Sequence, residues 1–127
     1  MSTNGVRPGL HSVTPYLIVD GARKLIEFAK HAFGAEEVSC YEADGRVAHA
    51  EIRVGDSILE LSDARPEYPA TQAVLHYYVA DVDAVYAKTL EAGATSITVP
   101  ADQPYGERGA GVKDPFGNQW YLATWLG

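Results

Sequence analysis

The stretch Val13-Thr-Pro-Tyr-Leu-Ile-Val-Asp20 decides how this chain folds, because its pattern returns 61 residues later as Val74-Leu-His-Tyr-Tyr-Val-Ala-Asp81. Both stretches are β-branched and aromatic runs of the kind found in strands. Each ends in an aspartate, which is a favoured residue at the start of a helix. The two stretches therefore predict a structural repeat, with a helix after Asp20 and another after Asp81.

The segments that follow come in the same order in both halves. Apolar residues at helical spacing predict helices that end at Gly34 and at Gly93. Alternating or β-branched runs between turn residues predict the other strands, at 36–41, 47–54, 57–61, 95–99, 111–113 and 119–125. Between strands, a loop rich in Gly and Pro is expected at 100–109. Each half is thus predicted to contain a strand, a helix and three strands.

This pattern predicts one α+β domain over residues 1–127. Residues 1–10 lack periodicity and are expected to form a leader or an arm that packs late. The two βαβββ modules are expected at 11–63 and 73–126, joined by a Pro-containing linker at 64–72. One helix can cover only one face of each sheet. The tandem modules are therefore expected to form cupped mixed sheets, with the uncovered faces shaping a shared cup.

Composition and charge exclude several classes of partner. The chain has 127 residues, of which 46% are hydrophobic and 21% charged, as in globular domains and unlike disordered chains. Its formal net charge of −7 disfavours binding to nucleic acid and to anionic membranes. The single cysteine, Cys40, permits no intrachain disulfide and is expected to be a small buried side chain. Without a signal core or an apolar span, the sequence predicts a cytoplasmic protein.

Three further segments carry a resemblance to a known family: His49-Ala-Glu-Ile-Arg-Val-Gly-Asp56, Tyr105-Gly-Glu-Arg108 and Asp114-Pro-Phe-Gly-Asn118. With the stretch at 13–20, they make nearly the whole chain resemble the vicinal oxygen chelate superfamily, and its PhnB-like branch in particular. That superfamily includes glyoxalase I, bleomycin-resistance proteins and extradiol dioxygenases. The resemblance implies tandem βαβββ modules and a homodimer whose subunits complete each other's cups. It leaves the activity open, because enzymes and drug-sequestering proteins share this fold.

The resemblance also implies where a divalent metal would be bound, at the first and last strands of each module. The matching positions here are Val13, Val74, Glu60 and Tyr121. Glu60 alone is a good ligand, whereas a metal site needs about three or four N or O donors. A slip of two residues in the alignment would bring His76 into place. The usual metal site is therefore expected to be broken, and no cofactor is expected.

Strand alternation sorts the remaining candidates between the helix side and the cup. It places Ala48 on the helix side and its neighbour Val47 on the opposite face. By the same rule, the side chains expected to line the cup as ligand-binding residues are His49, Glu51, Glu60, His76, Tyr78, Tyr121 and Trp125. Arg108, on the loop at 100–109, is the further candidate and would meet an anionic ligand at the mouth of the cup.

Each group of candidates has two interpretations. The His and Glu residues either form a metal site or an acid/base pair, or they hydrogen-bond one another in a polar lining. The aromatic residues either stack on a ligand or fill a core or a dimer seam. Arg108 either binds an anion or pairs with Glu107 or another surface acid. The segment 114–118 is expected to be a turn.

The favoured hypothesis is a metal-independent protein that binds a small molecule in the cup. The alternative is a divalent-metal-dependent lyase, isomerase or dioxygenase that uses His49, Glu60 and His76 as ligands, with Glu51 moving protons. A third possibility is a dimer whose cup is filled by its own side chains. No residue is assigned a catalytic role, and the identity of the ligand is left open.

Overall fold

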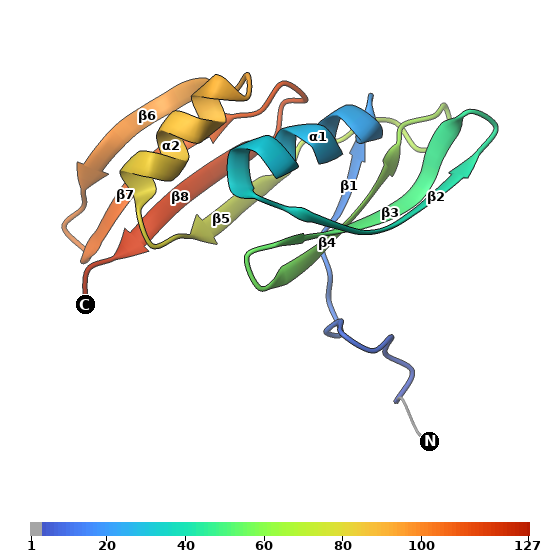
Figure 1. Ribbon diagram of the computed structural model, residues 1–127, viewed down its shortest axis with the longest axis horizontal. Coiled ribbons are helices and arrows are strands. Elements are labelled where there is room, and N and C mark those ends of the chain that lie inside the picture. The colour runs from blue at the N-terminus through green and yellow to red at the C-terminus, as the bar shows by residue number, and fades with distance from the viewer. Residues whose placement is uncertain (1–3) are drawn as a thin grey trace.

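Two four-stranded sheets, each with one helix, make up the computed structural model, which describes residues 4–127. The first three residues of the predicted leader lie outside this range. The helices lie on the same side of both sheets, and the N-terminal segment projects on the other side (Figure 1). The elements in chain order are β1 Tyr16–Val19, α1 Ala22–Phe33, β2 Glu36–Ala43, β3 Arg46–Val54, β4 Ser57–Asp63, β5 Val74–Tyr78, α2 Val82–Glu91, β6 Thr95–Asp102, β7 Glu107–Lys113 and β8 Gln119–Trp125.

The two sheets have the same topology, which confirms the predicted α+β fold of two tandem βαβββ modules. The strand order is β1-β4-β3-β2 in the first sheet and β5-β8-β7-β6 in the second. In each sheet the first strand pairs in parallel with the last strand of its module, and the other pairs are antiparallel. No helix in the described part of the chain is long and apolar enough to cross a membrane.

The internal repeat is offset by one residue from the register predicted for the first strands. Tyr16 pairs with Glu60 on β4, and His76 pairs with Tyr121 on β8, so Tyr16 corresponds to His76 and not to Tyr77. The start of α1 shows the same offset, because it lies one residue later than predicted. Gly21, with φ of 113°, is the N-cap of α1, so the predicted capping role of Asp20 is wrong. Asp81 does cap α2 as predicted, accepting the N–H of Ala84 at 3.2 Å.

A bulge in β3 corrects a second expectation. The pairing of β2 with β3 shifts between Tyr41 and Glu42, which face His49 and Val47 respectively. One extra residue in a strand reverses the alternation beyond it. Val47 consequently points into the core, with 3% of its surface exposed, and Ala48 is only half-buried. The predicted faces hold for the remainder of β3, where Ala50 and Ile52 are buried on the helix side.

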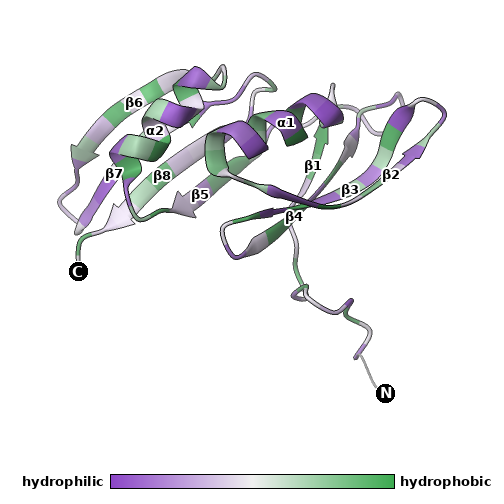
Figure 2. Ribbon diagram, viewed as in Figure 1, coloured by the Kyte–Doolittle hydropathy of each residue, from purple (hydrophilic) through white to green (hydrophobic). Residues whose placement is uncertain are grey.

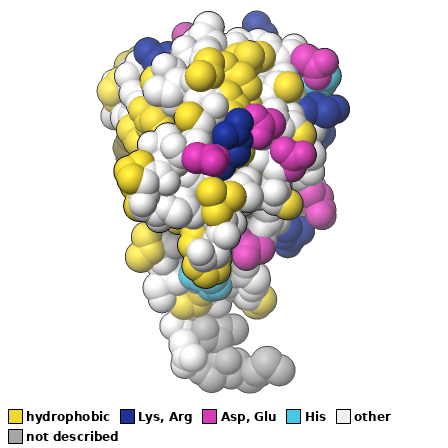
Figure 3. Space-filling model, turned by 90° about the vertical axis from the view of Figure 1, so that its left-hand side faces the viewer, with side chains coloured by type: hydrophobic (Ala, Val, Ile, Leu, Met, Phe, Trp, Pro, Cys, Tyr) yellow, Lys and Arg dark blue, Asp and Glu magenta, His cyan; other side chains and the backbone are white. Residues whose placement is uncertain are grey.

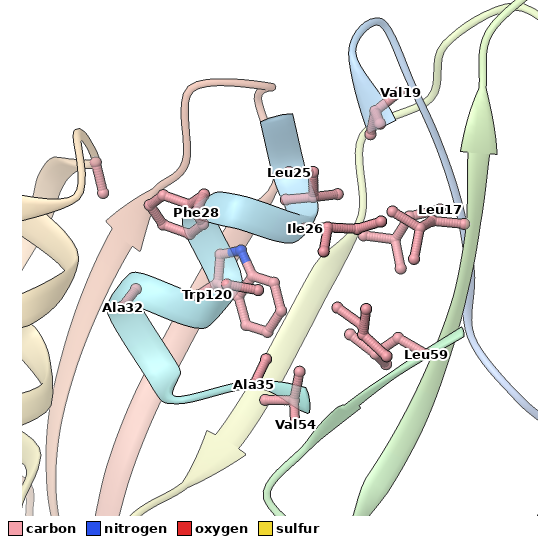
Figure 4. Close-up of a cluster of buried hydrophobic side chains, with 14 of the residues drawn as sticks. Leu17, Val19, Leu25, Ile26, Phe28, Ala32, Ala35, Val54, Leu59 and Trp120 are labelled. Atoms are coloured by element: carbon pink, nitrogen blue, oxygen red, sulfur yellow. The ribbon is translucent and has the colours of Figure 1, made fainter. Parts of the chain in front are cut away.

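One hydrophobic core joins the two modules beneath the helices. α1 packs against α2, and buried apolar residues of the helices and strands form one cluster. Hydrophobic segments are spread over both helices and both sheets (Figure 2). Trp120 of β8 lies beneath α1, near Phe28 (Figure 4). A side chain of the second module therefore packs under the helix of the first module. The Phe33 ring at the end of α1 has its centroid 4.7 Å from Trp120 and 5.3 Å from Tyr77. These three rings form the seam between the modules.

Two predictions concern segments near strand ends. The segment 114–118 is a turn, as predicted, and Asp114 stabilises it by accepting the N–H groups of Phe116 and Asn118 and the indole N–H of Trp120. The loop expected at 100–109 is shorter, because β6 continues to Asp102 and β7 begins at Glu107. The alternating residues of this hairpin are therefore placed on two faces of a sheet and not over the mouth of a cup.

Candidate functional site

A polar cluster lies on the face of the first sheet that the helices leave uncovered. His49 and Glu51 come from β3 and Glu60 comes from β4, all three on alternating positions that point away from α1. One potential ligand atom from each of the three lies within 4.8 Å of the others. The Nε2 atom of His49 is 2.7 Å from Glu60 Oε1, and the Tyr16 ring lies beside His49 with centroids 5.9 Å apart. We call these three polar residues the β3–β4 cluster.

Residues 4–15 form an N-terminal arm that reaches this cluster. Arg7 Nη1 donates to Glu51 Oε2 at 2.9 Å. The side chain of Glu51 is 6% exposed, whereas that of Arg7 is 65% exposed. Arm residues that include Arg7, His11 and Thr14 line, together with Glu60, a cavity of about 330 Å³. The arm therefore covers the cluster without filling the space above it.

The uncovered face of the second sheet carries a different group of side chains. The phenol of Tyr78 donates to Glu107 Oε2 at 2.5 Å, and His76 Nε2 is 3.7 Å from Glu107 Oε1. The bond to Glu107 raises the pKa of Tyr78 above its ordinary value. Tyr78 and Trp125 are 59% and 70% exposed, and together with Glu107 they line an open hollow.

Glu107 is not among the residues that the sequence predicts for this site. The sequence predicts a loop there, and only the observed start of β7 at Glu107 gives it a strand position. The register Gly109–Ala123 and Glu107–Trp125 then puts it on the same face as Trp125. The sequence signal that could have identified Glu107 is the alternation of β8, extended to the residues of the preceding strand that pair with it.

The structure brings only some of the predicted residues together. His49, Glu51 and Glu60 are within reach of one another, whereas His76 lies on the other sheet, beside Glu107. Tyr121 donates its hydroxyl to Gln119 at 2.7 Å on that same sheet. The three-ligand set of His49, Glu60 and His76 is thus not assembled within the described residues of one chain.

The residues at the superfamily's four metal positions do not fit a metal ion. Val13 and Val74 offer no donor atom, and Tyr121 offers a phenol that is engaged with Gln119. The corrected register replaces Val13 by Thr14, whose hydroxyl is a poor ligand beside carboxylate and imidazole. Glu60 remains the single good donor, as the sequence predicted. Among residues 4–127, the group of His, Cys, Asp and Glu side chains close enough together to hold a metal ion is the β3–β4 cluster.

Arg108 lies on the helix side of the second sheet. Its Nε and Nη2 atoms bond to the two oxygens of Asp83 on α2 at 2.8 and 3.0 Å, and Nη1 bonds to Asp102 at 3.0 Å. These contacts raise the pKa of Arg108 and lower that of Asp83. Basic and acidic side chains adjoin one another on this end of the molecule (Figure 3). The structure therefore shows the surface ion pair that was the alternative to anion binding.

Cys40 on β2 is half-buried, which is less burial than the sequence predicted. Arg23 Nη2 lies 3.1 Å from its Sγ. Burial nevertheless raises the pKa of the thiol, with Arg23 opposing that shift. Burial therefore disfavours the nucleophilic thiolate form of Cys40.

Comparisons with known proteins agree with this architecture. Residues 9–122 match the model of the family described as Glyoxalase/Bleomycin resistance protein/Dioxygenase superfamily. An uncharacterized protein of Mycobacterium bovis is 35% identical over 123 residues, covering 87% of this chain and 81% of that protein. An uncharacterized protein of Mycobacterium tuberculosis is also 35% identical over 123 residues, and the match covers 87% of this chain and 72% of that protein.

Solved structures with this fold include TioX from a Micromonospora species, with a TM-score of 0.73, 22% identity, and coverage of 91% of this chain and 100% of that one. A gene product of Arabidopsis thaliana has a TM-score of 0.74 and 25% identity, with coverage of 90% and 98%. A Bacillus cereus protein described as PhnB has a TM-score of 0.73 and 19% identity, with coverage of 90% and 99%. With the family match over most of its length, this chain belongs to the Glyoxalase/Bleomycin resistance protein/Dioxygenase superfamily.

Proposed function

We propose that this protein binds a small molecule on its uncovered sheet faces without the metal ion of its superfamily. The observation that carries the proposal is the mutual pairing of the polar groups. His49 is bonded to Glu60, and Glu51 is bonded to Arg7, so the potential metal ligands are already satisfied. Side chains that are already paired with one another suit an organic ligand, because such a ligand can exchange hydrogen bonds with them. They suit a divalent cation less well, because a cation needs free lone pairs on its ligand atoms.

The ligand site is proposed to combine both modules. The β3–β4 cluster supplies a polar floor, and the aromatic side chains Tyr78, Tyr121 and Trp125 supply apolar walls. These groups lie on two separate sheets of one chain. In the proposed assembly two copies face each other, so that the cluster of one copy and the aromatic side chains of the other enclose the ligand. The exposure of 70% at Trp125 is consistent with a surface that a second copy covers.

The proposal therefore includes a homodimer, located in the cytoplasm, of a single-domain chain with modules at 11–63 and 73–126. Assignment to the PhnB-like branch of the superfamily is part of the same proposal. It is supported by the segments at 49–56 and 105–108 and by the fold shared with the Bacillus cereus protein.

Elemental analysis of the purified protein, with calorimetric titration of Zn²⁺, Mn²⁺, Ni²⁺ and Fe²⁺, tests the proposal. We expect metal far below one ion per chain and no saturable heat. Variants His49→Ala and His76→Ala are compared with His31→Ala, which removes an exposed imidazole on α1. A thermal-shift screen of small molecules then supports the proposal if a compound raises the melting temperature of the wild type and of His31→Ala but not of His49→Ala.

A second candidate function is a divalent-metal-dependent lyase, isomerase or dioxygenase. The observation that favours it is the approach of the donor atoms of His49, Glu51 and Glu60 to within 4.8 Å. One imidazole and two carboxylates are a ligand set that zinc, manganese and iron accept. Stoichiometric metal that is lost in His49→Ala and kept in His31→Ala would establish this function and overturn the metal-free proposal.

A further inference from the structure

Glu51 lies buried on the face of the first sheet that the N-terminal arm covers, and the sheet does not supply the positive charge that neutralises its carboxylate. Glu51 is 5% exposed on β3, and within residues 4–127 the cation that contacts it is Arg7 of the N-terminal arm. A buried carboxylate is stable as an anion only beside a cation or several hydrogen-bond donors. The neighbouring imidazole of His49 bonds to Glu60 instead. The β3–β4 cluster therefore needs one cation from outside the sheet.

We infer that Arg7 stands in for the charged end of the ligand. The site accepts a small molecule that carries a guanidinium, amidinium or ammonium group, and this group displaces Arg7 from Glu51. The inference rests on the proposed ligand-binding function and names the chemical class that the site would select.

The contact of Arg7 is built so that it can be exchanged. Its guanidinium is 65% exposed and reaches Glu51 through Nη1 alone, at 2.9 Å. A guanidinium or amidinium that approaches from the cavity can instead bind the carboxylate with two parallel N–H groups, which is the stronger arrangement. The arm precedes β1 and turns through Gly5 and Gly9 at φ of 78° and 89°.

Space and an aromatic surface lie next to the carboxylates. The cavity of about 330 Å³ between the arm and Glu60 is within the range of small-molecule sites, which is about 300–1,000 Å³. The Tyr16 ring stands beside His49, where it can contact the body of a bound molecule and attract its charge through the ring face. A cationic group attached to a planar ring matches both features.

The sign of the charge distinguishes this site from an anion site. Once Arg7 leaves, the cluster holds two carboxylates and one imidazole that is already bonded to Glu60. Of the other arginines near this sheet, Arg53 pairs with Glu36. Arg46 and Arg65 line a hollow with Tyr16 and Tyr68, and its lining includes none of the three cluster residues. An anionic ligand would therefore meet repulsion at the β3–β4 cluster.

Benzamidine and benzamide are the probes that test the inference, because they share a shape and differ in charge. Both are titrated by calorimetry into protein freed of metal with EDTA, using the wild type and the variants Arg7→Gln, Glu51→Gln and Arg53→Gln. A tethered side chain competes at an effective concentration in the millimolar range. We therefore expect Arg7→Gln to bind benzamidine about tenfold more tightly than the wild type.

The other variants complete the expected pattern. Glu51→Gln loses benzamidine binding, Arg53→Gln matches the wild type because its exposed pair with Glu36 lies outside the cluster, and benzamide binds each protein at least about tenfold more weakly. Hydrogen exchange supplies a readout that does not depend on how Glu51→Gln folds. In the wild type with benzamidine, the amides of residues 4–14 should exchange faster, while those of β3 and β4 exchange more slowly.

Each opposing result has a distinct meaning. Equal affinity for benzamidine and benzamide, or unchanged affinity in Arg7→Gln, overturns the cation inference and leaves the metal-free ligand site standing. Absence of any benzamidine binding to Arg7→Gln also overturns the inference. Stoichiometric metal bound by His49, Glu51 and Glu60 would overturn the proposed function itself, because the cation displacing Arg7 would then be a metal ion.

Discussion

Asp63 and Thr124 occupy equivalent positions in the two modules, and each caps the helix of its own module. Asp63 Oδ1 accepts the backbone N–H of Ala22 at 2.7 Å, and Thr124 Oγ1 accepts that of Val82 at 3.0 Å. Both residues stand near the end of the last strand of their module, far along the chain from the helix that they cap. The cap therefore ties the first strand–helix unit of each module to its last strand.

Replacing these two caps should destabilise the protein unequally. Asp63 also accepts the N–H groups of Gly21 at 3.3 Å and Val47 at 2.8 Å, so Asp63→Ala leaves three donors without their acceptor. We expect Asp63→Ala to lower the free energy of unfolding by about 2–4 kcal/mol and Thr124→Ala by about 1–2 kcal/mol. Urea denaturation measures both, and Thr124→Ser, which keeps the hydroxyl, serves as the control. A larger loss for Thr124→Ala than for Asp63→Ala would contradict this account.

The aromatic seam between the modules should contribute strongly to stability. The Phe33 ring contacts Trp120 at 4.7 Å and Tyr77 at 5.3 Å between centroids, and these contacts bridge α1 to the second sheet. Phe33→Ala should lower the free energy of unfolding by about 3 kcal/mol, and Phe33→Leu by about 1 kcal/mol. A double-mutant cycle of Phe33→Leu with Trp120→Leu should give a coupling of about 0.5–1.5 kcal/mol. Strict additivity of the two changes would show that the rings do not interact.

Glu37 should make a small, pH-dependent contribution to stability. Hydrogen bonds from Arg23 and Lys30 lower the pKa of Glu37 below its ordinary value of 4.5. A depressed pKa in the folded state stabilises the protein above the unfolded pKa, and this stabilisation is lost as the pH falls through the folded value. We expect Glu37→Gln to be less stable than the wild type by about 0.5–1 kcal/mol at pH 7.

That difference should shrink as the pH falls below 4.5 and disappear below the folded-state pKa, where both states bind the proton, and it should also shrink in about 1 M salt. Denaturation curves between pH 7 and pH 3 measure it. Glu36→Gln removes an exposed carboxylate of the same strand, paired with Arg53 at 3.2 Å, and is the matched control. A stability gap that grows as the pH falls would rule out this assignment.

Two glycines of β7 offer a paired test of the second sheet's uncovered face. A Cβ at Gly111 would lie 2.9 Å from Cε1 of Tyr121 and 3.2 Å from Thr98 Oγ1, whereas one at Gly109 would meet nothing closer than 3.5 Å. Gly111→Ala should therefore displace the Tyr121 ring and lower the free energy of unfolding by about 1–3 kcal/mol, while Gly109→Ala changes it by less than about 1 kcal/mol.

The same pair tests the proposed aromatic wall. Any compound found to stabilise the wild type should bind Gly111→Ala more weakly and Gly109→Ala normally, as measured by calorimetry. Equal binding by both variants would remove Tyr121 from the proposed site.

Much of the fold was predictable because it depends on local patterns. Periodicity of 2 and 3.6 residues located the strands and helices, and the repeated stretches at 13–20 and 74–81 predicted two like modules. Three local details were wrong, one of them being the extent of the loop at 100–109. The bulge at Val47 depends on how β2 pairs with β3, and the later start of α1 depends on the cap from Asp63, which is remote in the sequence.

The candidate site was predictable only as a set of faces. Alternation placed His49, Glu51 and Glu60 on one side of the first sheet, and the structure brings them within 4.8 Å of one another. Alternation did not identify Glu107, because the sequence predicts a loop at that residue. Nor did it predict that Arg108 turns toward α2, where two carboxylates hold its guanidinium.

The sequence by itself thus determined the modules, their order and, outside the bulge at Val47, which of the predicted strand residues share a face, since these follow from side-chain periodicity within short segments. Only the tertiary structure decided which charges neutralise one another. The bond between Arg7 and Glu51 joins residues 44 positions apart, and that between Arg108 and Asp83 joins residues 25 apart. Such pairs depend on where distant segments meet in space, and no pattern in a single strand or helix encodes that meeting.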